Sequence, residues 1–313
     1  MAGYPERAAT VGPTAIPVGR LSAAIPYLAL LGAVTMLPIA TSFAKRLFPL
    51  VGAPGVTSYR VTFAALILLA IWRPWRRGLS RADLVAAARY GAVLGLMNLC
   101  FYMAIRTIPL GVAIAIEFLG PLAVALSLAR RAVHVLWIAL TVAGLALLLP
   151  IGPDVGRLDL TGAGFALAAA AFWALYIIFG KRTSHLHAGV AVALGMSTAA
   201  IVVVPFGVAT AGLRLLSPTA LGLGLLVAIC TSAIPYSLEM VALKGIPRRT
   251  FGVLLSVEPV AGALAGLVLL GERLTALQGL AIACIVAASA GAVLTSADAE
   301  RGYHADDAPA PTA

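Results

Sequence analysis

Ten long apolar segments follow one another along the chain with short connections between them, and they restrict the fold more than any other feature. A helix that crosses a lipid bilayer needs about 20 mostly apolar residues. Segments of roughly that length are found at 24–44, 53–72, 84–105, 109–128, 132–150, 161–180, 188–212, 219–243, 249–270 and 274–296. In lipid, every backbone polar group must be hydrogen-bonded within the protein, so segments of this kind form helices. The sequence therefore predicts an all-α integral membrane protein with ten transmembrane helices.

The composition also indicates a chain that is mostly embedded in lipid. Of its 313 residues, 61% are hydrophobic and 11% are charged, and the mean hydropathy is +1.02. A soluble domain carries about 25% charged residues. The net charge of +10 comes without a basic helix or an aromatic and basic surface, so nucleic acid is not an expected partner. We expect the polar, proline-containing ends, residues 1–23 and 297–313, to be disordered.

The distribution of Lys and Arg predicts the orientation in the membrane. With both termini in the cytoplasm, fifteen basic residues lie on the cytoplasmic side and six on the other side, while Arg60 lies inside the second segment. Cytoplasmic loops carry an excess of Lys and Arg, so we expect cytoplasmic N- and C-termini in the inner membrane. The adjacent Lys45 and Arg46 fit this orientation least well, because they fall on the side with fewer basic residues.

The two halves of the chain resemble each other. The apolar segments around Glu117 and Glu258 align with each other at an offset of 141 residues. In each segment a single glutamate lies among uncharged residues. Five segments in residues 24–150 thus recur as five more in 161–296. An odd number of spans per repeat gives the repeats opposite orientations, so the pattern predicts two inverted five-helix repeats. Many secondary transporters have this plan, with the binding site near the middle of the membrane between the repeats.

Besides Arg89 and Arg249, which we assign to the cytoplasmic ends of their segments, four charged residues fall within the apolar segments: Arg60, Glu117, Glu239 and Glu258. A charge near the centre of a bilayer costs about 2.5–3.5 kcal/mol on insertion scales, so such residues are candidates for substrate or proton binding. The alternative is that the glutamates pair with Arg60 and only hold the bundle together. For Glu239, an ion pair with the nearby Lys244 is the favoured alternative, and Arg248 offers a second partner.

Small residues and prolines surround two of these glutamates. Gly262 and Gly266 follow Glu258 at spacings that place all three on one helix face, which predicts contact with another helix rather than with lipid. Pro259 directly follows Glu258, and Pro121 lies four residues after Glu117. A proline inside a helix removes one backbone hydrogen bond, so the freed carbonyl groups can line a cavity.

Polar and aromatic side chains within the same segments are candidates for shaping a binding pocket, although core packing is the alternative for each one. These candidates are Asn98, Tyr102, Trp173, Tyr176, Tyr236 and Ser256. The sequence has no glycine-rich phosphate loop, and its four histidines lie at segment ends or in connections. We therefore expect no metal, no cofactor and no enzymatic activity.

The C-terminal stretch "SVEPVAGALAGLVLLGERLTALQGLAIACIVAASAGAVL", residues 256–294, resembles the terminal signature of the EamA-type drug/metabolite transporter family. Residues 42–60, 109–126, 159–177 and 231–259 are similar to a branch of that family that exports threonine, homoserine and related small amino acids across the bacterial inner membrane. The resemblance covers residues 24–296. It implies two EamA repeats, at 24–150 and 161–296, and a secondary active exporter that works by alternating access and proton antiport.

An amino-acid substrate is chemically compatible with the charged candidates. Its ammonium group suits Glu117 or Glu258, and its carboxylate suits Arg60 or a helix N-terminus. The alternative is an exporter of the same fold for an aromatic compound, a nucleobase or a cationic drug. A passive channel is a further alternative. The sequence leaves the oligomeric state open between a monomer and a homodimer.

Overall fold

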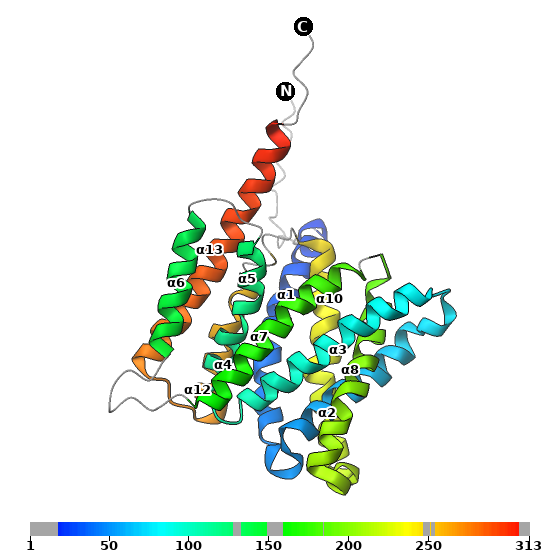
Figure 1. Ribbon diagram of the computed structural model, residues 1–313. Coiled ribbons are helices and arrows are strands. Elements are labelled where there is room, and N and C mark those ends of the chain that lie inside the picture. The colour runs from blue at the N-terminus through cyan, green and yellow to red at the C-terminus, as the bar shows by residue number, and fades with distance from the viewer. Residues whose placement is uncertain are drawn as a thin grey trace, which may run out of the picture.

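The computed structural model describes residues 18–127, 133–148, 159–183, 185–246, 251 and 254–306, and the described part of the chain is helical without strands (Figure 1). Its α-helices are α1 (Val18–Lys45), α2 (Phe48–Trp72), α3 (Arg81–Ala104), α4 (Leu110–Glu117), α5 (Leu119–Ser127), α6 (Val133–Leu148), α7 (Leu160–Lys181), α8 (Ala188–Ala211), α9 (Pro218–Ala228), α10 (Ile234–Gly245), α12 (Glu258–Leu270) and α13 (Ala276–Asp306). The short 3-10 helices are η1 (Pro74–Arg76) and η2 (Gly212–Leu216), and the π-helical segment η3 (Ile229–Ala233) joins α9 to α10.

Six of the helical stretches are long and apolar enough to cross a membrane, which supports a multi-pass membrane protein. They are Ala24–Lys45, Phe48–Arg76, Arg81–Ala104, Leu160–Lys181, Gly189–Leu216 and Pro218–Glu239. Shorter apolar helices lie at Leu110–Val124, Val135–Gly144, Glu258–Leu270 and Ala276–Gly291, within the other four predicted segments. The prediction of an all-helical membrane protein is thus confirmed, and the ten-helix count stays a prediction.

Three of the predicted segments are broken rather than continuous helices. The segment 109–128 is divided into α4 and α5 at Phe118, the segment 219–243 contains η3, and α12 begins at Glu258, inside the segment 249–270. A proline lies at or within three residues of each break, and its missing N–H weakens the helix there.

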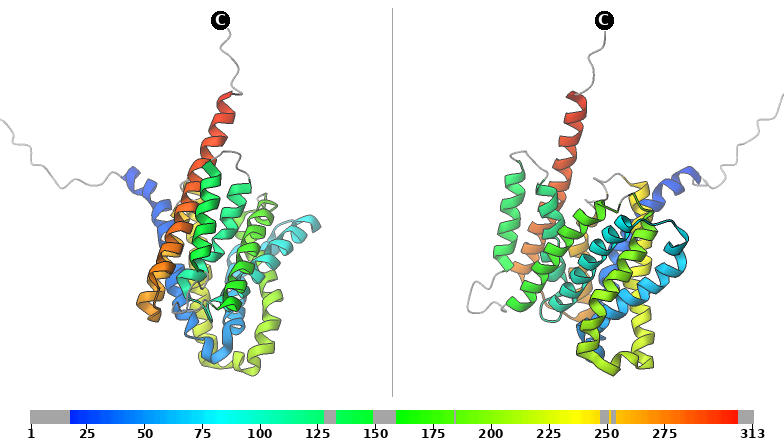
Figure 2. Two further views of the ribbon diagram at one scale, coloured as in Figure 1. Left: turned by 60° about the vertical axis from the view of Figure 1, so that its left-hand side comes forward. Right: turned by 45° about the vertical axis from the view of Figure 1, so that its right-hand side comes forward.

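The helices pack in pairs that are far apart in the sequence. α2 packs against α8, α4 against α12, and α6 against α13, and α3–α7 and α1–α10 are two further pairs. Figure 2 shows α6 and α13 side by side along one flank of the bundle. Glycines permit the close α4–α12 contact: a Cβ atom built on Gly111 would lie 2.5 Å from the Cα atom of Ala263, and one on Gly262 would collide with Ile114.

The last helix extends beyond the predicted segment. α13 continues to Asp306, so residues 297–306 are helical where the sequence predicted a disordered tail, and Figure 1 shows this end of α13 projecting from the bundle. Ala, Glu and Arg in this stretch have high helix propensity and prolong a helix that has already formed. At the other end, α1 begins at Val18, inside the predicted disordered lead. Residues 1–17 and 307–313 lie outside the described residues.

Candidate functional site

A cavity of about 600 Å³ lies inside the bundle, and its wall is formed by parts of α1, α2, α3, α4, α7, α8, α10 and α12. It brings together eight of the ten candidate residues: Arg60, Asn98, Glu117, Trp173, Tyr176, Tyr236, Glu239 and Glu258. The other two are also buried but do not line the cavity. The Tyr102 ring packs against the Arg60 guanidinium, and Ser256 lies two residues before the start of α12.

Glu117 and Glu258 lie at the two breaks that face each other across the α4–α12 contact. Glu117 is the last residue of α4, Glu258 is the first residue of α12, and both are buried. The close glycine packing of these helices confirms the prediction that the face of Glu258 meets another helix. Because Pro121 has no N–H, it cannot hydrogen-bond to the backbone carbonyl of Glu117 in the α-helical pattern. A carboxylate in the first turn of α12 also lies at the end of the helix that favours negative charge.

Arg60 crosses from α2 to the π-helical segment. Its guanidinium donates from Nε to Ser232 Oγ at 3.0 Å and from Nη2 to the carbonyl oxygen of Thr231 at 3.1 Å. The Thr231 carbonyl is available because Pro235, its partner in a regular α-helix, has no N–H to donate. The guanidinium carbon also lies 5.5 Å from the ring centroid of Tyr102, within the range of a cation–π contact.

Within the described residues, no carboxylate lies within 4.0 Å of the Arg60 guanidinium, since the two ion pairs found there join Lys45 to Glu272 and Asp83 to His185. Arg60 therefore forms no direct ion pair with a glutamate in this conformation, and a structural role for Arg60 beside the glutamates stays an alternative. The proposed partners of Glu239 differ in this respect. Arg248 and the side chain of Lys244 lie outside the described residues, and that interpretation stays untested.

Aromatic side chains form much of the remaining wall. The hydroxyl groups of Tyr90 and Tyr176 are 3.2 Å apart and their ring centroids 5.0 Å apart, which joins α3 to α7. Trp173 packs edge-on against Phe118, with 5.1 Å between centroids, directly at the break between α4 and α5. Tyr236 and Glu239, three residues apart on α10, both line the cavity, as is expected of residues on one helix face. Tyr90 was missed by the sequence analysis, where only its position directly after Arg89 set it apart from core aromatics.

The cavity extends toward one end of the bundle. Its wall includes Gly180, Lys181, Thr183 and Leu186, which belong to the end of α7 and the connection to α8. Lys181 was counted in the sequence analysis only as a loop charge. This is the end at which α1 begins and α13 projects (Figure 1).

The opposite end is closed by an ion pair and an apolar cluster. Lys45 Nζ, at the end of α1, lies 2.6 Å from Glu272 Oε1, and Glu272 Oε2 accepts a hydrogen bond from the backbone N–H of Leu110 at 2.8 Å. Ile105 and Ile108 are buried in the cluster that also contains Leu110. The sequence analysis missed Glu272, and the only signal was the unexplained basic pair at Lys45.

The described residues contain no group of three or more His, Cys, Asp or Glu side chains arranged to hold a metal ion. The chemistry that the cavity offers is therefore that of carboxyl, guanidinium, hydroxyl and aromatic groups.

Comparison with known proteins gives three findings. A model described as the EamA-like transporter family matches residues 160–294. The threonine/homoserine exporter RhtA of Salmonella typhimurium is 49% identical over 271 residues, which are 87% of this chain and 92% of that protein, and RhtA of Escherichia coli K12 is 48% identical over the same extent. A solved crystal structure, described only as that of a protein, matches 88% of this chain and 99% of its own with a TM-score of 0.54 and 22% identity, a likeness of fold alone.

Proposed function

This chain belongs to the EamA-like transporter family, and on that premise we propose that it exports small amino acids of the threonine and homoserine type from the cytoplasm. The observation that carries the proposal is the long, nearly uninterrupted similarity to exporters named for these two amino acids. The comparisons confirm the family resemblance, and the relatives are transporters rather than enzymes. The cavity supplies what a zwitterionic substrate needs, as the following contacts indicate.

Arg60 is suited to the substrate carboxylate. A guanidinium has five N–H donors, and Ser232 and Thr231 accept from two of its nitrogens, which fixes the orientation of the planar group at the cavity wall. Glu117 and Glu258 lie on the same wall without a described cationic partner within 4.0 Å and are suited to the ammonium group. The two charged groups of the amino acid could thus form direct ion pairs that these side chains do not form with each other.

A second candidate substrate class is favoured by the size and lining of the cavity. Its volume of about 600 Å³ is typical of pockets for drug-sized molecules, and Tyr90, Trp173 and Tyr176 offer aromatic surface. An aromatic or cationic metabolite would use the same carboxylates with a larger apolar contact. Competition of such compounds with threonine in a transport assay distinguishes the two classes.

The packing of the helices supports two inverted five-helix repeats. When each helix is replaced by its equivalent in the other half, the α3–α7 contact becomes the α1–α10 contact. The other three pairs, α2–α8, α4–α12 and α6–α13, each consist of two equivalent helices packed against each other. The broken helices that carry Glu117 and Glu258 are such an equivalent pair. Discontinuous helices at the contact between repeats are the usual location of the substrate site in this architecture.

The asymmetry of the two ends supports alternating access. With the termini in the cytoplasm, as the distribution of Lys and Arg predicts, the cavity faces the cytoplasm and the Lys45–Glu272 ion pair closes the outer end. Release of substrate to the outside then requires separation of α1 from the end of α12. A permanently open pore would have no such closed end, so this arrangement favours a transporter over a channel.

Proton antiport requires a carboxyl group that binds a proton on one side and releases it on the other, and Glu117 and Glu258 are our candidates. The experiment uses liposomes loaded with radiolabelled threonine or homoserine, an imposed pH gradient, and the wild-type, Glu117→Gln and Glu258→Gln proteins. We expect gradient-driven efflux that either substitution reduces at least tenfold. Glu300→Gln, on the projecting end of α13, is the matched control and should transport normally.

The possible results separate substrate from coupling. Normal gradient-driven efflux in both glutamine variants would refute the proton-binding role and leave the exporter intact. A wild-type protein that moves neither amino acid but moves an aromatic or cationic compound would refute the amino-acid substrate.

A further inference from the structure

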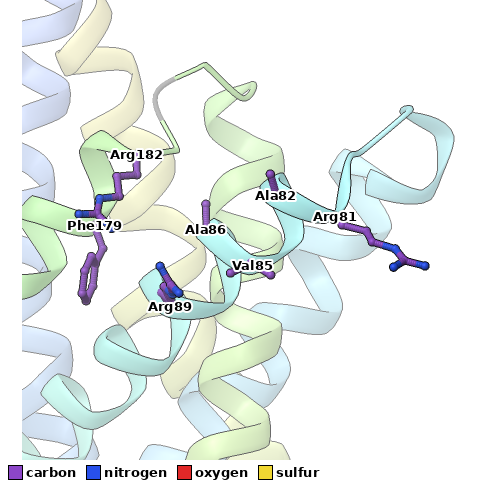
Figure 3. Close-up of a pocket in the computed structure, with 7 residues that line it drawn as sticks. All are labelled: Arg81, Ala82, Val85, Ala86, Arg89, Phe179 and Arg182. Carbon is purple, nitrogen blue, oxygen red and sulfur yellow. The ribbon is translucent and has the colours of Figure 1, made fainter.

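A second cavity, of about 370 Å³, lies between α3 and α7 on the outside of the bundle (Figure 3). Its wall is apolar, with Ala82, Val85 and Ala86 from α3 and Phe179 from α7. Its charged residues are all basic: Arg81, Arg89 and Arg182. It shares no residue with the central cavity, so the export cycle does not account for it.

The three arginines have no internal counter-charge. In the part of the chain that the structure describes, no carboxylate lies within 4.0 Å of any of them. The acid nearest in sequence, Asp83, is engaged elsewhere: its Oδ1 lies 2.7 Å from His185 Nε2, and its Oδ2 accepts from the Ser80 N–H at 2.9 Å. The positive charge at this cavity is therefore available to an external anion.

Two of the arginines line the cavity close to Phe179. Figure 3 shows Arg89 and Arg182 on facing helices, with Phe179 beside them, whereas the side chain of Arg81 extends away from the other labelled residues. The guanidinium carbon of Arg182 lies 5.6 Å from the Phe179 ring centroid, which holds the charge against the apolar wall. Planar guanidinium groups bind phosphate oxygens through paired N–H donors.

The location of this cavity favours a lipid headgroup over free phosphate as its ligand. α3 begins at Arg81 and α7 ends at Lys181, so the cavity lies at the ends of two membrane-crossing helices, where lipid headgroups meet acyl chains. Leu84 and Val85 on the same stretch of α3 are 47% and 50% exposed, and such apolar surface is suited to contact with hydrocarbon. Basic pockets between transmembrane helices bind anionic headgroups.

We propose that this cavity is a binding site for an anionic phospholipid, with the headgroup phosphate between Arg89 and Arg182 and the start of an acyl chain against Val85 and Phe179. Free phosphate would make no use of the apolar wall. A merely diffuse attraction between basic residues and the membrane surface would not need the two arginines to converge on one concave site. The proposal does not depend on which molecule the central cavity transports.

The test measures binding of phosphatidylglycerol to the purified full-length protein by native mass spectrometry, with phosphatidylcholine of the same chain length as the neutral comparison. Loss of one basic side chain near the membrane surface lowers the affinity for an anionic lipid about fivefold, so Arg89→Gln/Arg182→Gln should bind phosphatidylglycerol about 25-fold more weakly. Arg76→Gln/Arg77→Gln is the matched control, since it removes the same charge from exposed residues outside the cavity. It should retain wild-type affinity.

Three results would overturn the proposal. The first is equal weakening in the control variant, which would indicate diffuse attraction only. The second is equal affinity for phosphatidylcholine. The third is full displacement of phosphatidylglycerol by inorganic phosphate at a concentration similar to that of the lipid, which would indicate a free-phosphate site. Because binding is measured on a protein that is not transporting, a failed export assay does not affect the outcome.

Discussion

Removal of the charge on Glu272 should open the closed end of the central cavity. Two contacts hold that end: the 2.6 Å ion pair with Lys45 and the 2.8 Å hydrogen bond from the N–H of Leu110. The two charged side chains are 23% and 13% exposed, so solvent screens the pair only in part. Substitution by Gln preserves the size of the side chain but removes the charge that strengthens both contacts.

The size of the effect follows from these contacts. A hydrogen bond to a charged group contributes about 1.5–3 kcal/mol, and Gln retains one neutral acceptor, so we expect a net loss of about 2 kcal/mol from the closed conformation. Since every 1.4 kcal/mol corresponds to a factor of ten, the ratio of outward-open to outward-closed protein should rise about thirtyfold.

The assay is labelling of a single cysteine in the central cavity by a membrane-impermeant maleimide added from outside. Thr41→Cys provides the cysteine, because Thr41 lines the cavity on α1, and the three native cysteines are replaced by alanine. Glu272→Gln should raise the labelling rate about thirtyfold. The double charge exchange Lys45→Glu/Glu272→Lys should slow the labelling again only in part, because it recreates the ion pair with opposite polarity but provides no acceptor for the Leu110 N–H.

Asp83→Asn is the matched control, because it removes the other described ion pair, the 2.7 Å contact with His185 at the open end of the cavity. It should not raise labelling from outside. An unchanged rate in Glu272→Gln, or an equal rise in Asp83→Asn, would refute the idea that the Lys45–Glu272 pair closes the outer end.

Three further predictions concern other parts of the structure. Arg60→Lys should lower threonine efflux at least tenfold, because a point charge cannot replace the two directed bonds to η3 that orient the guanidinium group; equal efflux would contradict this role. Gly262→Leu should destabilise the protein by about 1–3 kcal/mol through overpacking against α4, measured by thermal unfolding in detergent, whereas Gly279→Leu, where a new Cβ meets no atom within 4 Å, should not. At Asp159, the Thr107 hydroxyl and then the Thr161 N–H lower the pKa of the carboxyl group below its ordinary value of about 3.9. The ionised Asp159 carboxylate therefore stabilises the fold above about pH 4, and this stabilisation is lost as the pH falls through the folded-state pKa. Unfolding curves between pH 6 and pH 3 should show a smaller acid-induced loss of stability in Asp159→Asn than in wild type.

The apolar pattern predicts where the chain forms helices, because burial in lipid leaves few other solutions for the backbone. The breaks were harder to predict. Pro121 and Pro259 indicated local weakening of the helices, but not that α4 would end at Glu117 and α12 begin at Glu258. The position of a helix break depends on which group hydrogen-bonds to the backbone atoms that the break leaves without an intrahelical partner. That group comes from another part of the chain.

The candidate site was predicted well in membership and less well in its contacts. Charged residues in apolar segments are costly unless they face the interior, and the charged, polar and aromatic candidates include eight residues of the cavity wall. It could not find the partners of Arg60 on η3, nor the pairing of Lys45 with Glu272, which are 227 residues apart. Both depend on tertiary packing, for which one sequence carries little information.

The π-helical segment η3 determines in which direction around the helix axis the side chains of α10, which follows it, point. One wide turn at Ile229–Ala233 holds an additional residue compared with a regular α-helix. If the same residues formed a regular α-helix instead of this wide turn, the rest of the segment would be rotated by about 100°. Tyr236 and Glu239 would then turn away from the cavity together, although neither had been substituted. The length of this turn, as much as the identity of the side chains, determines which residues the substrate meets.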